Sequence, residues 1–280
     1  MPELPEVETI KRTLERFVKY QTIENIDVYW GKIIQRPDDV EHFRHLLTGE
    51  TFQRIERKGK FLLFYLTESV LVSHLRMEGK YRVVPRETEL NKHTHIVFRL
   101  TNGEDLRYED IRKFGTMHVF PIGQEKVEKP LRKLGPDPFE AAYRFAYVQE
   151  RLQKTTRWIK AALLDQTIIA GLGNIYVDEV LFLSKVHPER RAHTLTDEEI
   201  RNIVHYTKEV LETAVEQGGT TIRSYVDGEG EMGMFQQALY AYGQESKPCK
   251  HCGTDIIKLK VAGRGTHICP FCQVLEGEEI

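Results

Sequence analysis

The sequence predicts an α+β protein of several domains, in which a β-rich N-terminal part is followed by helices and then by a compact metal-binding end. Three observations support this prediction. Apolar residues recur at helical spacing over residues 4–20, whereas short apolar or alternating runs separated by turn residues fill residues 22–120. All four cysteines lie after residue 248. We expect the β-rich part to be a β-sandwich or a flattened barrel, with the first helix packed on it.

Length and composition are those of an ordinary globular protein. With 280 residues, the chain is long enough for two domains and a sizeable core. Its 40% hydrophobic and 29% charged residues are typical of soluble proteins. No apolar run approaches the roughly 18 residues that a membrane-spanning helix needs, and the N-terminus lacks the basic-then-apolar pattern of a secretory signal. We therefore expect a cytoplasmic protein with no membrane partner.

Each element of the β-rich part has its own sequence signal. Residues 4–20 place one apolar stripe on a helix, formed by Leu4, Val7, Ile10, Leu14, Phe17 and Val18. The predicted strands are FLLFYL (61–66), VLVSHL (70–75), THIVFRL (94–100) and TMHVF (116–120). Turn residues such as TNGE (101–104) separate these runs.

The second part of the chain is predicted to be helical. KLGPDPFEAA (133–142) contains two prolines and is expected to be a linker. The helices predicted after it span residues 141–154, 158–165, 174–184 and 196–217. Thr196 followed by Glu199 is a capping box that marks the start of the last helix. A glycine-rich stretch (218–236) leads to the cysteines, and we place the domains at residues 1–132, 133–239 and 240–274.

Basic residues gather in three places, although the net charge is only −2. RIERKGK (54–60) and the stretch 247–264 are two of them. The third, RLQKTTRWIK, spaces Arg151, Lys154, Arg157 and Lys160 three apart with no acid between them, which predicts a ridge on a helix. One such run is often only solvated surface. Three together favour a phosphate-binding face, with Lys154 among the candidate DNA contacts.

The cysteines form two CxxC pairs, Cys249 with Cys252 and Cys269 with Cys272, separated by sixteen residues. Each pair can supply two thiolates to a tetrahedral ion, so the spacing predicts one structural Zn²⁺. Two disulfides or a redox pair are the alternatives. A cytosolic location disfavours disulfides, and a redox motif does not need two copies.

The stretch IIKLKVAGRGTHI (256–268) between the cysteine pairs predicts a hairpin. Gly263, Arg264 and Gly265 are expected at its turn, where the metal site would hold an arginine within reach of a phosphate. His251 and His267 lie near the pairs, but four cysteines already complete the site, so we do not expect either histidine to be a ligand.

The N-terminus, MPELPEVETI, combines two signals. Pro5, Glu6 and Glu8 suit the first turn of a helix, because proline needs no donor there and carboxylates complement the positive helix end. Pro2 and Glu3 need another explanation. Once the initiator methionine is removed, Pro2 carries a free secondary amine with a pKa of about 7.7–8.0. Roughly a quarter to two-fifths of such an amine is neutral near pH 7.5.

A neutral secondary amine is a nucleophile. Its addition to C1′ of a sugar would give an iminium that cannot lose its charge by deprotonation and therefore favours elimination. Glu3 could donate or shuttle the required proton. Tautomerases instead use an N-terminal proline as a base, but they are very small subunits without a zinc ribbon.

Six motifs remain to be explained together: MPELPEVETI, RKGKFLLF, SHLRMEGKY, YEDIRKFG, LLDQTIIAGLGNIYVDE and GRGTHICPFCQ. They resemble bacterial formamidopyrimidine-DNA glycosylase, from residue 2 to residue 273. The resemblance implies an N-terminal β-sandwich, a helix-two-turn-helix domain and a C-terminal zinc finger, with damaged double-stranded DNA bound between the halves. It also implies base excision repair, with excision of 8-oxoguanine and formamidopyrimidines followed by β,δ-elimination.

The resemblance also implies residue roles by position. Pro2 matches the Schiff-base nucleophile and Glu3 the general acid, while Lys60 and Arg264 match the residues of β- and δ-elimination. Positions that match DNA contacts are His74, His93, Arg112, Asn174, Tyr242 and Lys258. Those that match the residues filling the space left by a flipped nucleotide are Met77, Arg112 and Phe114. Taken singly, Met77 and Phe114 would be interpreted as core residues, and His93 as structural.

Two positions depart from the common family pattern. Phe271 in CPFC replaces a basic residue, which would remove a phosphate contact, and Asp227 in SYVDGEGE stands where asparagine is common. The alternative functions are the related endonuclease VIII branch, for oxidised pyrimidines, and a non-catalytic zinc-ribbon DNA-binding protein. The ELPE start and the R-K-F-G motif favour the purine branch, and a mere DNA binder gives Pro2 and Glu3 no role. We expect a monomer associated with the nucleoid.

Overall fold

The computed structural model describes residues 1–220, 234 and 237–275. These residues divide into two compact units. Unit 1 comprises Met1–Lys133 and Thr220, and unit 2 comprises Leu134–Gly219 and the described residues from Met234 onward. The predicted helices of the second part and the cysteine-bearing end thus fall in the same unit. Asp227, singled out above, lies outside the described residues.

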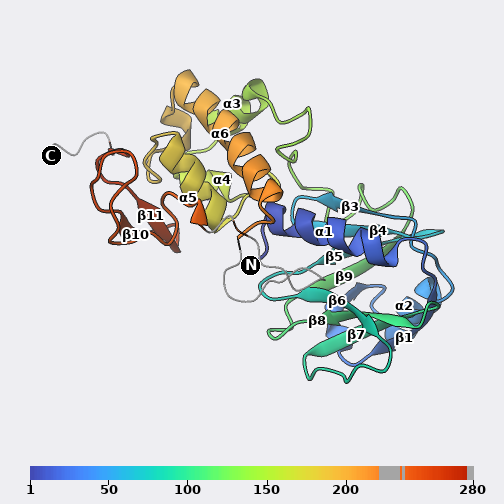
Figure 1. Ribbon diagram of the computed structural model, residues 1–280. Coiled ribbons are helices and arrows are strands. Elements are labelled where there is room, and N and C mark those ends of the chain that lie inside the picture. Colours follow the sequence, from blue (N-terminus) through green and yellow to red (C-terminus); the bar gives the residue numbers. More distant parts are fainter. Residues whose placement is uncertain (221–233, 235–236, 276–280) are drawn as a thin grey trace. The chain divides into compact units, whose positions relative to one another are not determined.

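Unit 1 is a sandwich of two sheets (Figure 1). The first sheet is antiparallel with the order β1-β7-β8-β6, and its strands are β1 (Ile23–Val28), β6 (Lys80–Pro85), β7 (Thr94–Leu100) and β8 (Glu104–Glu109). The second sheet has the order β2-β9-β5-β4-β3, with β2 (Ile34–Arg36), β3 (Arg54–Lys58), β4 (Phe61–Tyr65), β5 (Ser69–His74) and β9 (Thr116–Pro121). Only the short β2 pairs in parallel, with β9. All four predicted strands are confirmed.

The first helix covers the second sheet. α1 (Leu4–Val18) packs on β3 and β4, and its predicted apolar stripe is buried apart from Phe17, which is partly buried. This stripe joins a core that includes Phe43 of α2 (Val40–Leu47), which follows the short helix η1 (Gly31–Ile33). Neither α2 nor η1 was predicted. Removal of this apolar surface from water is the main force holding the sandwich together.

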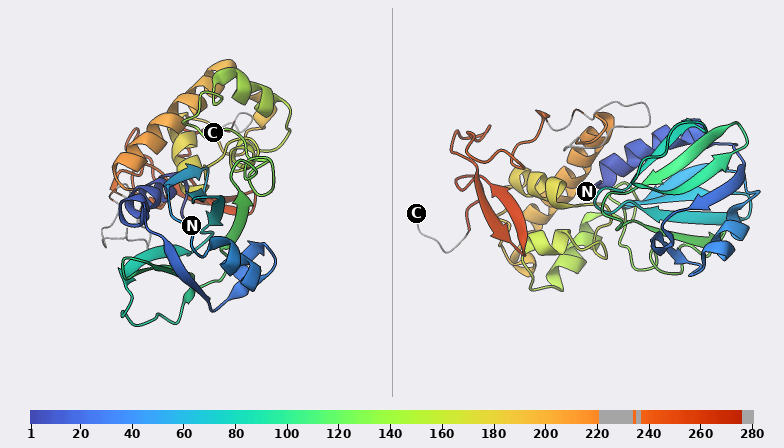
Figure 2. Two further views of the ribbon diagram at one scale, coloured as in Figure 1. Left: turned by 90° about the vertical axis from the view of Figure 1, so that its right-hand side faces the viewer. Right: turned by 90° about the horizontal axis from the view of Figure 1, so that it is seen from below.

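Unit 2 contains helices and one hairpin. The helices are α3 (Phe145–Gln153), α4 (Ile159–Leu163), α5 (Asn174–Leu183), η2 (Ala192–Thr194) and α6 (Asp197–Glu216). α5 packs against α6 and against β11 of the hairpin β10 (Ile257–Val261) and β11 (Arg264–Ile268), as Figure 2 shows. The four predicted helices are confirmed, as is the capping box, because Thr196 and Glu199 exchange hydrogen bonds of 2.8 and 3.2 Å.

The predicted basic ridge is wrong. α3 ends at Gln153 and α4 begins at Ile159, so the four cations do not share a helix. Lys154 donates to Glu150 at 2.6 Å, Arg157 pairs with Asp165 at 2.9 Å, and Lys160 is fully buried. The prediction failed because the stretch itself contains no acid, whereas in the fold two acids outside it, Glu150 and Asp165, pair with its cations.

None of the helices among the described residues combines the length and hydropathy needed to cross a bilayer.

Candidate functional site

The first residues of the chain are held at the start of α1. Pro2 and Glu3 are buried, whereas Met1 is half-exposed. The backbone N–H of Glu3 donates to Glu6 Oε2 at 2.8 Å. The other carboxylate oxygen of Glu6 accepts from the N–H and the hydroxyl of Thr220, at 2.8 and 3.0 Å. Glu6 therefore fixes the N-terminus to a residue 214 positions away, a role that sequence analysis missed when it assigned Glu6 only to the helix start.

Glu8 connects α1 to the turn that carries Lys60. Its carboxylate accepts from Arg57 at 3.0 Å, and Arg57 also donates to the carbonyl of Gly59 at 2.9 Å. Burial raises the pKa of Glu8, but Arg57 and the neighbouring cations of α1 outweigh burial and hold that pKa below its ordinary value. Lys60 sits in the β3–β4 turn and is buried, with only 6% of its surface exposed.

His74 is the last residue of β5, and its imidazole ring is neutral. Burial, helped by Arg76 and Lys60, lowers the pKa of His74 to about 3. Its Nδ1 accepts the backbone N–H of Arg76 at 2.9 Å, so the ring proton lies on Nε2, and Nε2–H can donate. Phe61 packs edge-on against the ring at 4.4 Å between centroids. Such an N–H group suits a phosphate oxygen.

The loop after β8 presents two exposed side chains on a rigid frame. Arg112 lies 4.8 Å above the ring of Phe114, which is 52% exposed. The frame is Asp110, whose Oδ1 accepts the N–H of Arg112 at 3.0 Å, and whose Oδ2 accepts those of Phe114 and Gly115 at 2.9 Å each. Met77, in the middle of the loop between β5 and β6, is also exposed. Phe114 and Met77 are therefore not core residues.

Asp110 also fixes the loop that carries His93. Its backbone N–H donates to the carbonyl of His93 at 3.0 Å, and its carbonyl lies 2.7 Å from Nε2 of His95. Asp110 was not predicted, because an acid close to basic residues in the sequence is usually a surface residue. The signal available in the sequence was the glycine at position 115. In the structure, a Cβ at this position would lie 1.6 Å from the hydroxyl of Tyr108. A loop that can hold only glycine there is closely packed.

In unit 2, the hairpin turn differs by one residue from the prediction. Ala262 and Gly263 have φ values of +49° and +75°, which is the two-residue pattern of a type I′ turn. Arg264 is therefore the first residue of β11, paired with Val261, and does not occupy the turn itself. It remains exposed at the tip of the hairpin.

Buried charges of α4 and α5 hold this hairpin. Lys160 donates to Asp178 at 2.6 Å, to the hydroxyl of Thr266 at 2.8 Å and to the carbonyl of Gly265 at 3.3 Å. Asn174 donates to the same carbonyl at 2.9 Å. The residue directly after Arg264 is thus anchored by two side chains, which fixes the direction in which Arg264 leaves the hairpin.

Glu179 holds the segment that carries Tyr242. Its carboxylate accepts the backbone N–H groups of Tyr240, Ala241 and Tyr242 at 2.7–2.9 Å. Burial raises the pKa of Glu179, and these three bonds counteract part of that rise. The Tyr242 ring packs against His267 of β11 at 5.1 Å. Neither Asp178 nor Glu179 was predicted, because in the sequence both resemble ordinary helix-surface acids.

The four cysteines converge as predicted. Their Sγ atoms all lie within 4.8 Å of one another, with Cys249 and Cys272 at 4.0 Å and Cys252 and Cys269 at 3.4 Å. A tetrahedron with Zn–S bonds of about 2.3 Å requires sulfur atoms roughly 3.8 Å apart. The four thiols therefore fit Zn²⁺. Within the described residues, no histidine belongs to this group of possible metal ligands.

Three family models match successive parts of the chain. They are the formamidopyrimidine-DNA glycosylase N-terminal domain over residues 1–117, the formamidopyrimidine-DNA glycosylase H2TH domain over residues 134–226, and the zinc finger found in FPG and IleRS over residues 246–274. The chain belongs to the formamidopyrimidine-DNA glycosylase family. The predicted fold class is thereby confirmed, and the cysteine group is the structural zinc site of this family's zinc finger.

Relatives in this family match nearly the whole chain. Formamidopyrimidine-DNA glycosylase of Oceanobacillus iheyensis is 60% identical over 273 residues, 98% of each chain, and that of Bacillus licheniformis is 54% identical over 276 residues, 98% of this chain and 99% of the relative. Among solved structures, Lactococcus lactis Fpg with abasic site containing DNA has a TM-score of 0.92 and 41% identity, covering 98% of this chain and 100% of that one. A MutM complex with carbocyclic 8-oxo-G containing DNA has the same values.

The site residues predicted from the sequence are divided between the units. Those in unit 1 are Pro2, Glu3, Lys60, His74, Met77, His93, Arg112 and Phe114, and those in unit 2 are Lys154, Asn174, Tyr242, Lys258 and Arg264. Contacts group His93 with the Arg112–Phe114 loop, and Asn174 with the Arg264 hairpin. Lys258 is exposed on β10, 3.7 Å from Glu245. Lys154 contacts Glu150 instead of any predicted site residue.

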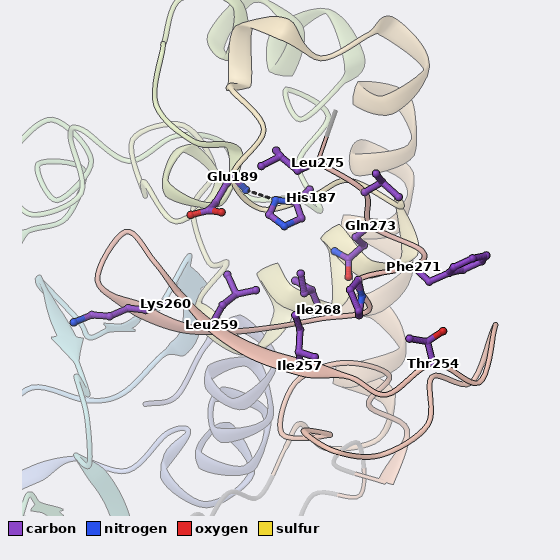
Figure 3. Close-up of a pocket in the computed structure, with 12 residues that line it drawn as sticks. His187, Glu189, Thr254, Ile257, Leu259, Lys260, Ile268, Phe271, Gln273 and Leu275 are labelled. Atoms are coloured by element: carbon purple, nitrogen blue, oxygen red, sulfur yellow. Dashed lines mark hydrogen bonds between the residues drawn. The ribbon is translucent and has the colours of Figure 1, made fainter. Parts of the chain in front are cut away.

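Phe271, which replaces the basic residue common in the family, is 65% exposed. It lies at the edge of a cavity of about 580 Å³ formed by the zinc finger and the loop after α5. Figure 3 shows its ring pointing away from the other lining residues. The position thus offers an apolar ring where a phosphate contact is expected from the family pattern.

Proposed function

We propose that this protein is a bifunctional DNA glycosylase and apurinic/apyrimidinic lyase. It excises oxidised purines, chiefly 8-oxoguanine and formamidopyrimidines, from damaged double-stranded DNA in base excision repair. Full-length family membership together with the Pro2–Glu3 start supports this function most directly. The solved relatives bound to abasic and 8-oxo-G containing DNA support the substrate.

The proposed reaction begins with removal of the half-exposed Met1, which frees the secondary amine of Pro2. The nitrogen attacks C1′ and the bond from C1′ to the damaged base breaks, with a proton supplied to the leaving side. Glu3 then supports opening of the sugar ring, in which the bond from C1′ to the ring oxygen breaks and the oxygen takes up a proton. The product is an iminium joining Pro2 to C1′.

Strand cleavage follows from the iminium. Its positive charge acidifies C2′, which loses a proton as the 3′ phosphate departs, and a second elimination releases the 5′ phosphate. Water then hydrolyses the iminium and restores the amine, leaving a one-nucleotide gap. We assign Lys60 to the first elimination and Arg264 to the second, since both present cations that can stabilise a departing phosphate.

The DNA contacts are part of the same proposal. Met77, Arg112 and Phe114 fill the space of the extruded nucleotide, which agrees with their exposure on closely packed loops. Phosphate contacts are assigned to His74, His93, Lys154, Asn174, Tyr242 and Lys258. The structural zinc ion is held by the four cysteines and keeps the Arg264 hairpin folded.

The proposal extends to the domain boundaries, the oligomeric state and the location. The domains divide at residues 1–132, 133–239 and 240–274. The protein acts as a monomer, because one site binds one lesion. It works in the cytoplasm, associated with the nucleoid through DNA binding.

Borohydride trapping tests the mechanism. The full-length protein is mixed with a duplex carrying 8-oxoguanine and reduced, which should yield a stable protein–DNA adduct that peptide mapping places on Pro2. Glu3→Gln should largely lose 8-oxoguanine excision yet keep more activity on abasic DNA, where no base has to leave. An adduct on Lys60 instead of Pro2 would refute the N-terminal mechanism.

A further inference from the structure

Unit 1 contains a cavity of about 370 Å³ that none of the assignments above uses. It opens between the end of β2, the loop after β5, strand β9 and the segment that ends unit 1. The residues that define its character are Gln35, Phe61, Arg76, His118, Lys129 and Lys133. All of them belong to unit 1.

The lining is cationic and contains no acid. Arg76, Lys129 and Lys133 make no ion pair with any of the described residues, and all three are exposed. Lys154 and Arg157, by contrast, are each paired with an acid. Unpaired cations gathered around one cavity create a local positive potential.

The acid that directly precedes the two lysines in the sequence is already paired with a cation that does not line the cavity. Glu128 precedes the two lysines, but Arg36 binds it at 2.5 Å. Arg36 is itself stacked on Phe120, 4.7 Å from the ring centre. Leu131, between the lysines, is buried. The segment is therefore fixed against the sandwich at two points, and the lysine side chains are left to face the cavity.

Arg76 enters the cavity from a constrained turn. Its backbone has a φ of +55°, in the left-handed region that non-glycine residues rarely adopt. Its N–H donates to Nδ1 of His74 at 2.9 Å. The same turn therefore orients both His74, a proposed DNA contact, and Arg76.

The floor of the cavity adjoins the proposed DNA surface. Phe61 lines the cavity and packs on the ring of His74. Burial, with Arg36 and Arg76, lowers the pKa of His118 to about 4, so this ring adds no charge of its own near pH 7 and can offer a neutral N–H. An anion in the cavity would thus lie near His74, a proposed DNA contact.

We propose that Arg76, Lys129 and Lys133 form a binding site for a backbone phosphate of the DNA duplex, outside the group of phosphate contacts assigned above. This proposal rests on the proposed function, because it takes DNA as the ligand. A phosphodiester matches three converging cations and no acid. The cavity in Figure 3 is a useful contrast, since its walls are mostly apolar and its Lys260 is accompanied by Glu189.

The salt dependence of DNA binding tests this site. The dissociation constant of the full-length protein is measured between 50 and 200 mM NaCl on a duplex with a tetrahydrofuran abasic analogue, which cannot be cleaved. Each phosphate contact contributes a slope of about 0.9 in the logarithmic plot of affinity against salt. The double variant Lys129→Ala/Lys133→Ala should lose one such contact. When the salt concentration rises fourfold, the factor by which affinity falls should therefore be about 3.5 times smaller for the double variant than for the wild type.

Lys126→Ala is the matched control, because Lys126 lies exposed in the same segment but does not line the cavity. An unchanged slope in the double variant, or an equal change in Lys126→Ala, would overturn the proposal. Inorganic phosphate that binds the DNA-free wild type, but not the double variant, while the DNA slope stays unchanged would mean a free-phosphate site and would also overturn it. Excision of 8-oxoguanine by the wild type is assayed separately, so failure of this site is distinguishable from failure of the proposed function.

Discussion

Asp110→Asn is predicted to loosen the loop that inserts Arg112 and Phe114 while leaving the sandwich folded. The wild-type carboxylate accepts three backbone N–H groups, and the Tyr108 hydroxyl at 3.3 Å. An asparagine side chain has the same size but only one oxygen. Its amide nitrogen is a donor and cannot accept a hydrogen bond from a backbone N–H group. At least one of these N–H groups must then lose its acceptor.

The magnitude follows from the burial of these groups. If the amide nitrogen replaces Oδ2, the buried Gly115 N–H loses its acceptor and cannot turn to water; if it replaces Oδ1, the part-buried bond from the Arg112 N–H is lost. A hydrogen bond to a charged group contributes about 1.5–3 kcal/mol, and an unsatisfied buried donor costs about 1–3 kcal/mol. We expect the ordered loop to lose about 2–3 kcal/mol, which corresponds to roughly 30- to 150-fold in an equilibrium constant.

Two measurements should report this change. Hydrogen exchange of the peptide containing residues 110–115 should accelerate by up to roughly 100-fold relative to the rest of β8 and β9. Single-turnover excision of 8-oxoguanine from duplex DNA should slow by a similar factor, because the loop must order before it can replace the extruded base. Strand cleavage at a preformed abasic site in single-stranded DNA should slow much less, since no duplex void has to be filled.

Asp27→Asn provides the control, because Asp27 lies on β1 and pairs with Arg99, away from the loop. It should change neither exchange at residues 110–115 nor the ratio of the two activities. If Asp110→Asn left exchange unchanged, or slowed both activities equally, Asp110 would not be the frame of this loop.

Phe114→Ala should slow excision from duplex by roughly 10- to 100-fold while affecting the lyase step on abasic DNA less, because extruding a paired base costs a few kcal/mol; equal losses would indicate a purely structural ring. Metal analysis should find one Zn²⁺ per chain, and Cys249→Ser should weaken DNA binding roughly tenfold or more by releasing the hairpin that carries Lys258 and Arg264; full binding by metal-free protein would contradict this. The folded-state pKa of His74, about 3, lies below its ordinary value of 6.5. The unfolded chain therefore binds more protons between these values, and the stability that the neutral ring contributes is complete above pH 6.5 and declines as the pH falls. Urea unfolding at pH 7 and pH 5 should show His74→Gln losing less stability than the wild type, by up to about 1.4 kcal/mol per pH unit.

Much of the fold could be predicted because its signals are local. The apolar stripe of α1, the capping box of α6 and the two CxxC pairs each lie within a few residues of one another. The missed strands show the limit. Two of the six residues of β6 (KYRVVP) and four of the six residues of β8 (EDLRYE) are charged. These segments become strands because β8 pairs with both β6 and β7.

The sequence motifs named the candidate site residues but not the buried acids that hold them in place. Asp110, Asp178 and Glu179 are charged, and charge normally indicates surface. Each is buried because partners from elsewhere in the chain satisfy it, as the N–H groups 61–63 positions beyond Glu179 do. The sequence separation of these partners hides the arrangement until the fold is known.

The buried link from Lys160 and Asp178 to Gly265 and Thr266 makes the zinc finger a poor candidate for transfer between proteins. A graft of residues 240–275 would carry the four thiols and bind its metal, but it would leave behind the two charges that aim the arginine. The isolated segment would also expose Thr266 and Val261, which are buried in the intact unit. Recombination between homologues near residue 240 separates positions 160 and 178 from position 266, so it should succeed only when both parents carry the same residues at these three positions. Across natural sequences, we expect these three positions to change together, and no more often than the position that tolerates the fewest substitutions.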